Sequence, residues 1–66
     1  MKVVLYSTGC PQCKVLKSKL DDAGIQYELV TDQSVMEAKG FTTAPMLEVD
    51  GEAMEFMPAL RWARDR

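Results

Sequence analysis

The chain begins with a strand-like pattern followed by a helix-like one. Val3 to Tyr6 form a β-branched and aromatic run bounded by turn-forming residues, which predicts a buried strand. Apolar positions then recur at roughly helical spacing, at Val15, Leu16, Leu20 and Ala23. Pro11 suits the first helical position, because the N–H group that it lacks would have no partner within the helix. Gly24 suits the left-handed residue that ends a helix.

The middle of the chain predicts a second strand and a short second helix. Residues 25–30 form the strand candidate. Ser34 and Glu37 have the spacing of a capping box, which would open a helix that Gly40 ends. Only residues 34–39 are left for this helix. We therefore expect a reduced element that exposes one face of the sheet, or leaves it to a partner or a second copy.

The last third of the chain predicts a hairpin and a final helix. Residues 46–49 and 52–56 flank Asp50-Gly51, a pair that favours a type I′ turn. Pro58 can open a helix that runs through residues 60–64. The element order is then β-α-β-α-β-β-α, and a helical crossover makes the first two strands parallel. We expect an α/β fold with helices on both faces of a four-stranded mixed sheet.

The length of the chain predicts one small domain over residues 1–66. A chain of this length buries only about 60% of the surface that its unfolded form exposes, so its stability is marginal. A disulfide between Cys10 and Cys13 would add little, because the entropic gain of a disulfide grows with the loop that it closes. The cysteine pair is therefore a poor structural clip.

Charge and hydropathy narrow the class of protein. Ten acidic and eight basic residues give a net charge of −2, and no basic block indicates nucleic-acid binding. The longest apolar run, Val3 to Tyr6, is far too short for a membrane span or the core of a signal peptide. We therefore expect a cytoplasmic protein. In a reducing compartment two cysteines more often serve catalysis or metal binding than cross-linking.

The two cysteines lie three positions apart at the predicted start of the first helix. Cys10 precedes Pro11, where unpaired backbone N–H groups and the helix dipole favour an anion. Reactive cysteines of Cys-x-x-Cys motifs at such positions have pKa values of about 3.5–7.5. Gln12 and Cys13 can offer N–H groups to the Cys10 sulfur, whereas Pro11 cannot. The position favours a thiolate at Cys10.

The surroundings of the motif assign different roles to the two thiols. Cys13 lies one turn into the helix and should face inward, where an apolar setting keeps it a thiol. Cys10 would attack a substrate disulfide, and Cys13 would then release the reduced substrate. Gly9 lets the backbone bend and leaves the approach to Cys10 open. Lys14 and Lys17 add a weak positive potential.

Two other interpretations of the cysteine pair stay open. A zinc site needs four ligands, and the chain has two cysteines and no histidine. A dimeric protein that holds zinc or an iron–sulfur cluster between two chains is therefore one alternative. An inert pair in a module that only binds a partner is the other. We favour redox catalysis, because the spacing, the helix start and the strand–loop–helix context agree.

The first strand, the Cys-Pro-Gln-Cys motif of residues 10–13 and the Thr43-Ala44-Pro45 stretch together resemble the glutaredoxin family over nearly the whole chain. The resemblance implies a minimal thioredoxin fold in which Cys10 is the nucleophile and Cys13 the resolving thiol. It also implies that Pro45 is a cis-proline facing them, and that the backbone of Ala44 pairs with bound glutathione or peptide. From the residues alone, Pro45 could equally be a trans residue that opens an edge strand.

We group the expected site residues by role. The catalytic residues are Cys10 and Cys13. The substrate-binding residues are Gly9, Pro11, Gln12, Thr43, Ala44 and Pro45. No metal ligands and no bound cofactor are expected.

Two departures from the family pattern bear on the reductant. Dithiol glutaredoxins usually carry a basic residue shortly before the first cysteine, where this chain has the uncharged Ser7-Thr8-Gly9. They also carry a Gly-Gly-acidic stretch after the hairpin, where this chain has residues 54–58, Met-Glu-Phe-Met-Pro. That segment resembles the aromatic-x-Pro of redoxins that donate electrons to ribonucleotide reductase and are reduced by thioredoxin reductase.

The sequence therefore predicts a thiol–disulfide oxidoreductase, an electron carrier that reduces protein disulfides. We favour a flavoprotein reductase, such as thioredoxin reductase, as its reductant over glutathione; a glutathione-dependent glutaredoxin is the alternative within this class. We expect a monomer whose partners are a disulfide-containing protein and the reductant, with no nucleic acid and no membrane.

Overall fold

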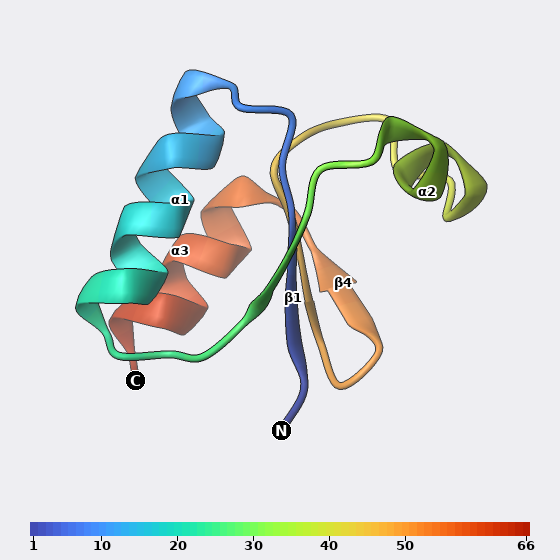
Figure 1. The fold of residues 1–66 in the computed structure, drawn as a ribbon. Helices are drawn as coiled ribbons and strands as arrows, with labels where there is room; N and C mark the ends of the chain where they lie inside the picture. The colour runs from blue at the N-terminus through green and yellow to red at the C-terminus, as the bar shows by residue number, and fades with distance from the viewer.

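The computed structural model describes residues 1–66 and contains the seven elements in the predicted order (Figure 1). They are β1 (Val3–Tyr6), α1 (Pro11–Asp22), β2 (Glu28–Val30), α2 (Gln33–Ala38), β3 (Met46–Val49), β4 (Glu52–Met54) and α3 (Phe56–Arg64). None of the three helices has the length and apolar character needed to cross a membrane.

The four strands form one mixed sheet in the order β2-β1-β3-β4. β1 pairs in parallel with β2 and antiparallel with β3, and β3 pairs antiparallel with β4. The α1 crossover makes β1 and β2 parallel, as expected for a strand–helix–strand unit. The predicted α/β architecture with a four-stranded mixed sheet is confirmed.

One face of the sheet carries the main core. Val3 and Leu5 alternate with Val4 and Tyr6 along β1, so the two pairs point to opposite faces. Val3 and Leu5 pack in one buried cluster with Leu47 of β3 and with residues of α1 and α3. The residues from the two helices are Leu16, Leu20, Ala59 and Ala63. In Figure 1, α1 and α3 accordingly lie on the same side of the sheet.

The opposite face is covered only in part, which agrees with the expected reduced second helix and differs from the expectation of helices over both faces. α2 lies at one end of the sheet (Figure 1), and its single buried residue, Met36, packs with Val4, Tyr6 and Met46. Within the sheet, Val4 is flanked by Glu28 of β2 on one side and Glu48 of β3 on the other. Because these neighbours are carboxylates, the part of the face that α2 leaves open is polar.

The second strand is shorter than the predicted residues 25–30, because the end of α1 uses the backbone of this segment. Gly24 has a positive φ of 70°, its N–H donates to the Asp21 carbonyl, and the Ile25 N–H donates to the Leu20 carbonyl. These two bonds form a Schellman motif, which confirms Gly24 as the helix stop. The Tyr27 hydroxyl donates to Asp21 over 2.8 Å, and pairing with β1 begins only at Glu28, which is opposite Val4.

The second helix begins at a different cap from the predicted one. Asp32, not Ser34, is the N-cap, and its carboxylate accepts a hydrogen bond from the Ser34 N–H over 2.9 Å. The predicted capping box of Ser34 and Glu37 is therefore wrong. Gly40 follows the helix with a φ of 78°, as expected for a left-handed stop.

The hairpin turn is confirmed, but its second strand ends early. Asp50 and Gly51 have φ values of 51° and 87°, the two positive angles of a type I′ turn. β4 ends at Met54, because Glu55 is the N-cap of α3 and its carbonyl accepts the first helical hydrogen bond, from Ala59. Pro58 thus lies in the first turn of α3, where its missing N–H costs nothing.

Candidate active site: a dithiol at a helix start

Cys10 is held at the start of α1 as the sequence predicts. It is the N-cap residue, with extended backbone angles, and Pro11 is the first helical residue. The N–H of Cys13 donates a hydrogen bond to the Cys10 sulfur over 3.1 Å. The N–H groups of Gln12 and Cys13 were both expected to reach this sulfur, and the N–H of Cys13 makes the hydrogen bond. A sulfur at this position lies at the positive end of the helix dipole, which stabilises a thiolate there.

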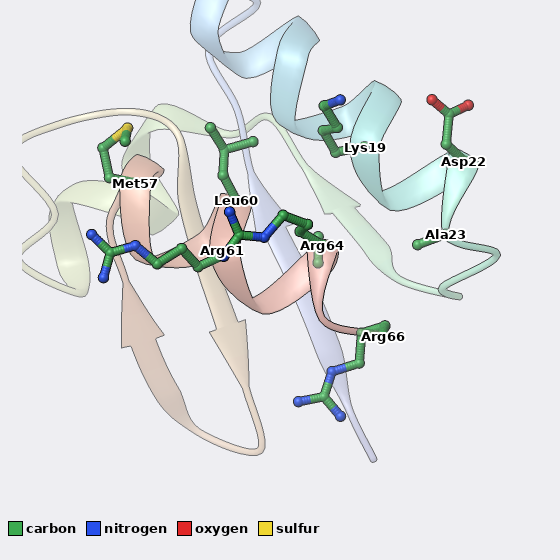
Figure 2. Close-up of a pocket in the computed structure, with 9 residues that line it drawn as sticks. Lys19, Asp22, Ala23, Met57, Leu60, Arg61, Arg64 and Arg66 are labelled. Carbon is green, nitrogen blue, oxygen red and sulfur yellow. The ribbon is translucent and has the colours of Figure 1, made fainter.

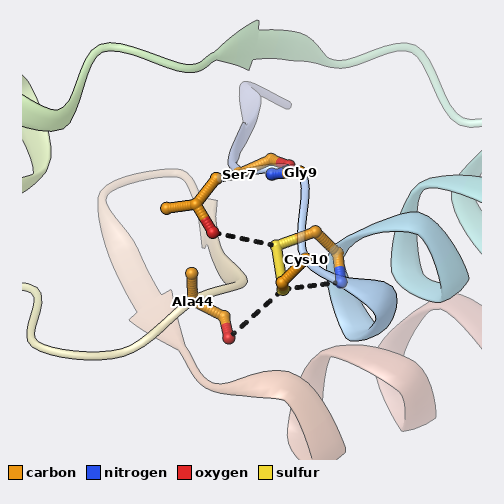
Figure 3. The surroundings of a disulfide bond; sticks show 6 residues. Ser7, Gly9, Cys10 and Ala44 are labelled. Atoms are coloured by element: carbon orange, nitrogen blue, oxygen red, sulfur yellow. Dashed lines mark hydrogen bonds between the residues drawn. A yellow bond between two sulfur atoms is a disulfide. The ribbon is translucent and has the colours of Figure 1, made fainter.

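Cys13 faces inward and differs sharply from Cys10 in exposure. Its residue surface is 1% exposed, whereas Cys10 is half-buried. The two cysteines are joined as a disulfide, with Cα atoms 5.0 Å apart (Figure 3). The Thr8 hydroxyl oxygen lies 3.9 Å from the Cys13 sulfur. This asymmetry leaves Cys10 as the sulfur that an incoming substrate can reach.

The loop before the cysteines is shaped by a glycine and a serine. Gly9 has a φ of 83°, a conformation that favours glycine, and an added Cβ there would meet no atom within 4 Å. The Gly9 N–H donates to the Ser7 hydroxyl over 3.1 Å, which closes a tight turn. The predicted bend at Gly9 and the open approach to Cys10 both follow from this geometry.

Lys14 and Lys17 lie beside the dithiol, and only Lys17 is held in an ion pair. Lys17 forms a salt bridge with Asp21 over 3.2 Å, and this hydrogen bond is the main reason that the pKa of Lys17 is raised. Its charge is therefore directed along α1, away from Cys10. Both lysines are exposed and line a groove that includes Cys13.

Pro45 lies beside the cysteines, and the Ala44–Pro45 peptide bond is cis, as the family resemblance implies. Pro45 is buried, and the Ala44 carbonyl oxygen lies 3.8 Å from the Cys10 sulfur (Figure 3). The backbone groups of Thr43 and Ala44 make no backbone–backbone hydrogen bond within the protein. They are free to pair with an extended substrate segment.

Two grooves include Thr43 and Ala44 in their lining. The first has a volume of 540 Å³ and includes Cys10. Its other residues are Thr8, Gln33, Met36, Glu37, Phe41, Thr42, Thr43 and Ala44. The second has a volume of 330 Å³ and is lined by Gln12, Thr43, Ala44, Pro45, Glu55, Phe56, Met57 and Pro58. Each groove contains one glutamate, and neither contains a lysine or an arginine.

The structure brings the expected site residues together around the disulfide. Gly9 and Pro11 flank Cys10 in the chain, and Gln12, Thr43, Ala44 and Pro45 share the second groove. Their roles in substrate binding stay predictions. Sequence reasoning did not single out Thr8 or Phe41. Phe41 stacks edge-on against Tyr6 with ring centroids 5.0 Å apart, and it lines the groove that includes Cys10.

Metal binding within one chain finds no support in the arrangement. No group of three or more cysteine, histidine, aspartate or glutamate side chains is placed to hold a metal ion. Zinc needs about four such ligands. A metal or cluster shared between two copies would have to use Cys10 and Cys13 from each.

A buried and an accessible cysteine at a helix start, beside a cis-proline at the end of a mixed sheet, define a thioredoxin-like dithiol protein. The model of the family described as Glutaredoxin matches residues 3–54, which include both cysteines, Pro45 and all four strands. The chain belongs to the glutaredoxin family. It is a thiol–disulfide oxidoreductase whose reactive pair is Cys10 and Cys13.

The chain is also similar to one curated protein and to one solved structure. The chain is 34% identical over 58 residues to a thioredoxin of Methanothermobacter thermautotrophicus, covering 79% of this chain and 75% of that protein. A trimeric glutathione transferase of Leishmania superposes with a TM-score of 0.77 and 23% identity. That match covers 98% of this chain but only 17% of the transferase chain, so it shows the fold alone. The predicted thioredoxin-like fold is confirmed.

Proposed function

We propose that the protein reduces disulfides of other proteins and receives its electrons from a flavoprotein reductase. The Cys10 thiolate attacks one sulfur of the substrate disulfide, forms a mixed disulfide, and expels the other substrate sulfur as a thiolate. Cys13 then attacks the Cys10 sulfur, re-forms the Cys10–Cys13 bond and releases the second substrate sulfur. Two electrons pass to the substrate, and the reductase returns them from NADPH.

The absence of a basic residue from the two grooves that share Thr43 and Ala44 carries the choice of a protein disulfide over glutathione; the lysines nearest the dithiol, Lys14 and Lys17, line a separate groove with Cys13. Glutathione carries two carboxylates, and Arg or Lys is the usual partner of a bound carboxylate. Here the grooves offer Glu37 and Glu55 in place of a cation. The free backbone of Thr43 and Ala44, by contrast, suits an extended polypeptide.

The segment after the hairpin supports a more specific acceptor. Phe56, Met57 and Pro58 line the second groove, and this aromatic-x-Pro stretch is similar to that of redoxins that serve ribonucleotide reductase. The relative named thioredoxin supports the same type of reductant. We therefore propose ribonucleotide reductase as a candidate acceptor. We further propose that the protein acts as a cytoplasmic monomer without a bound cofactor.

A paired-reductant assay tests the choice of electron donor. Reduction of insulin disulfides would be followed with NADPH and thioredoxin reductase, and in parallel with NADPH, glutathione and glutathione reductase. We expect turnover with the first system at least tenfold above that with the second. Turnover only with glutathione would overturn the choice of reductant and establish a glutathione-dependent glutaredoxin instead. Cys10→Ser, which lacks the nucleophile, is the blank for both systems.

A further inference from the structure

The basic residues are distributed unevenly over this acidic protein. Four of the eight basic residues line a single groove between α1 and α3, although the net charge is −2. They are Lys19 on α1 and Arg61, Arg64 and Arg66 on and after α3 (Figure 2). Of the ten acidic residues, only Asp22 lines the same groove. A local excess of cations of this kind attracts a polyanionic ligand.

These cations are largely free to bind a ligand. Neither Lys19 nor Arg61 forms a salt bridge, and both are exposed. Arg64 pairs with Asp65 over 3.5 Å, but both side chains are about 70% exposed (72% and 67%), so the pair contributes little. The Arg66 guanidinium lies over the Trp62 ring at 4.6 Å, which fixes its position without neutralising its charge. Basic residues near the end of a helix also offset the helix dipole. That role alone does not require the basic residues of two helices to line the same groove.

The groove is open and has an apolar side. Its volume is 510 Å³, and Met57 and Leu60 of α3 line it beside the arginines (Figure 2). Met57 is 57% exposed, which is high for a side chain of its type. The combination of apolar side chains with a basic rim fits a polypeptide that carries both acidic and apolar residues better than a small inorganic anion.

Met57 connects this groove with the substrate groove at the active site. It lines both the groove between α1 and α3 and the one formed by Thr43, Ala44 and Pro45. From Met57, α3 runs to Arg64, a length of roughly 10 Å at 1.5 Å per residue. An extended chain covers that length in about three residues. A polypeptide that follows the groove of Thr43, Ala44 and Pro45 as far as Met57 can therefore reach the arginines about three residues further on.

We propose that the protein substrate carries a short acidic and apolar segment next to its reducible disulfide, and that this segment docks in the groove between α1 and α3. The inference rests on the proposed function, since it describes the polypeptide whose disulfide Cys10 reduces. Lys19 and Arg61 attract the carboxylates, and Met57 and Leu60 contact the apolar residues. The groove thereby selects among protein disulfides that the exposed sulfur alone would not distinguish.

Designed peptides test this selection in turnover. Each contains a Cys-Gly-Gly-Cys disulfide, a three-residue spacer and a stretch of Asp, Glu and Leu; the control peptide has Asn and Gln in place of Asp and Glu. Both orientations of the stretch relative to the disulfide are made. We expect kcat/KM for one acidic peptide to exceed that of its control by about tenfold at low salt, mainly through KM, and this ratio to fall in 0.5 M salt.

Two charge reversals locate the effect. Arg61→Glu should bring the ratio of the acidic to the control peptide to about one or below. Lys2→Glu changes the net charge equally, and the Lys2 side chain forms no salt bridge and does not line the groove, so the ratio should be preserved. Equal loss of the ratio in both variants would overturn the proposal, since a general charge effect would then explain it.

A binding measurement separates this proposal from the proposed function. The same peptides, with serines in place of both cysteines and a fluorescent label, are titrated with the oxidised protein and followed by anisotropy. Preferential binding of an acidic peptide, lost in Arg61→Glu, supports the docking groove even when no peptide is reduced. Equal binding of the acidic and control peptides overturns it, even when both disulfide peptides are reduced and the oxidoreductase activity stands.

Discussion

The backbone N–H of Cys13 donates a hydrogen bond to the sulfur of Cys10 over 3.1 Å, so the resolving residue also stabilises the nucleophile. The bond exists because Cys10 is the N-cap of α1 and Cys13 is the third residue of the helix. A thiolate at Cys10 strengthens this bond, since hydrogen bonds to charged acceptors are roughly twice as strong as neutral ones. The motif spacing thus produces both the electrostatics and the order of attack.

Replacing each cysteine by serine should have different consequences. Cys13→Ser leaves Cys10 able to attack but unable to release the substrate, so a mixed disulfide on Cys10 should accumulate. Cys10→Ser leaves only the buried Cys13, and no adduct should form. Mass spectrometry after incubation with a disulfide peptide distinguishes the two. Adducts on Cys13 in the Cys10→Ser protein, at the rate seen for Cys10, would reverse the assigned roles.

Truncation of Met36 should destabilise the protein, because this side chain is the one that anchors α2 on the sheet. Met36→Ala removes a side chain that is 4% exposed, and such changes cost about 2–5 kcal/mol of the free energy of unfolding. Val35→Ala on the same helix is the matched control, since Val35 is 38% exposed. Urea unfolding measures both. Equal losses in the two variants would show that α2 is not anchored through Met36.

The link between Tyr27 and Asp21 should make stability depend on pH in the acid range. The hydrogen bond from Tyr27, followed by the one from Lys17, holds the pKa of Asp21 below its ordinary value of 3.8. A depressed pKa in the folded state adds stability that is present above 3.8 and is lost as the pH falls through the folded-state pKa.

Tyr27→Phe tests this link, because it removes the hydroxyl and retains the ring. The pKa of Asp21, measured by NMR titration of its carboxyl carbon, should rise toward 3.8 in the variant, and the acid loss of stability should become smaller. An unchanged Asp21 titration would show that the hydrogen bond from Tyr27 is not formed in solution.

Much of the fold could be predicted because local signals agree with it. Gly24 and the Asp50-Gly51 pair occupy positions with positive φ, where their conformational preferences are strong. The boundaries of β2 and α2 could not be predicted, because neighbouring residues are equally suited to begin each element. Asp32 and Ser34 are both good N-caps, and only the path of the loop decides between them.

The spacing of apolar residues in α1 correctly predicted only some of the residues on its buried face. Cys13, Leu16 and Leu20 are buried, whereas Val15 is 45% exposed and Ala23 is exposed as well. Cys13 faces inward, as its position one turn into the helix predicts, whereas Val15, which the apolar spacing placed on the buried face, does not. Cys13 serves packing and chemistry, and this dual use is invisible to a pattern that counts hydrophobic side chains alone.

The candidate site was predictable where its residues are adjacent in sequence and less so where loops meet in space. Cys10 and Cys13 follow from one motif. Phe41 reaches the groove at Cys10 from a distant loop, so no spacing in the sequence connects it with the motif. Thr8 directly precedes the motif, but nothing in the sequence indicates that its hydroxyl lies near the Cys13 sulfur. The basic groove between α1 and α3 could not be predicted either, because the helix dipole alone explains basic residues near the end of a helix. Only the packing of the two helices shows that these residues share a groove.

The ionisation of Cys10 tests the central claim most directly. In the reduced protein, the rate of alkylation by iodoacetamide would be followed against pH, with the modified cysteine identified by mass spectrometry. We predict that Cys10 reacts first, with a pKa below about 7.5, while Cys13 stays unmodified. A Cys10 that titrates near the free-cysteine value of about 8.5, and reacts no faster than Cys13, would contradict the account.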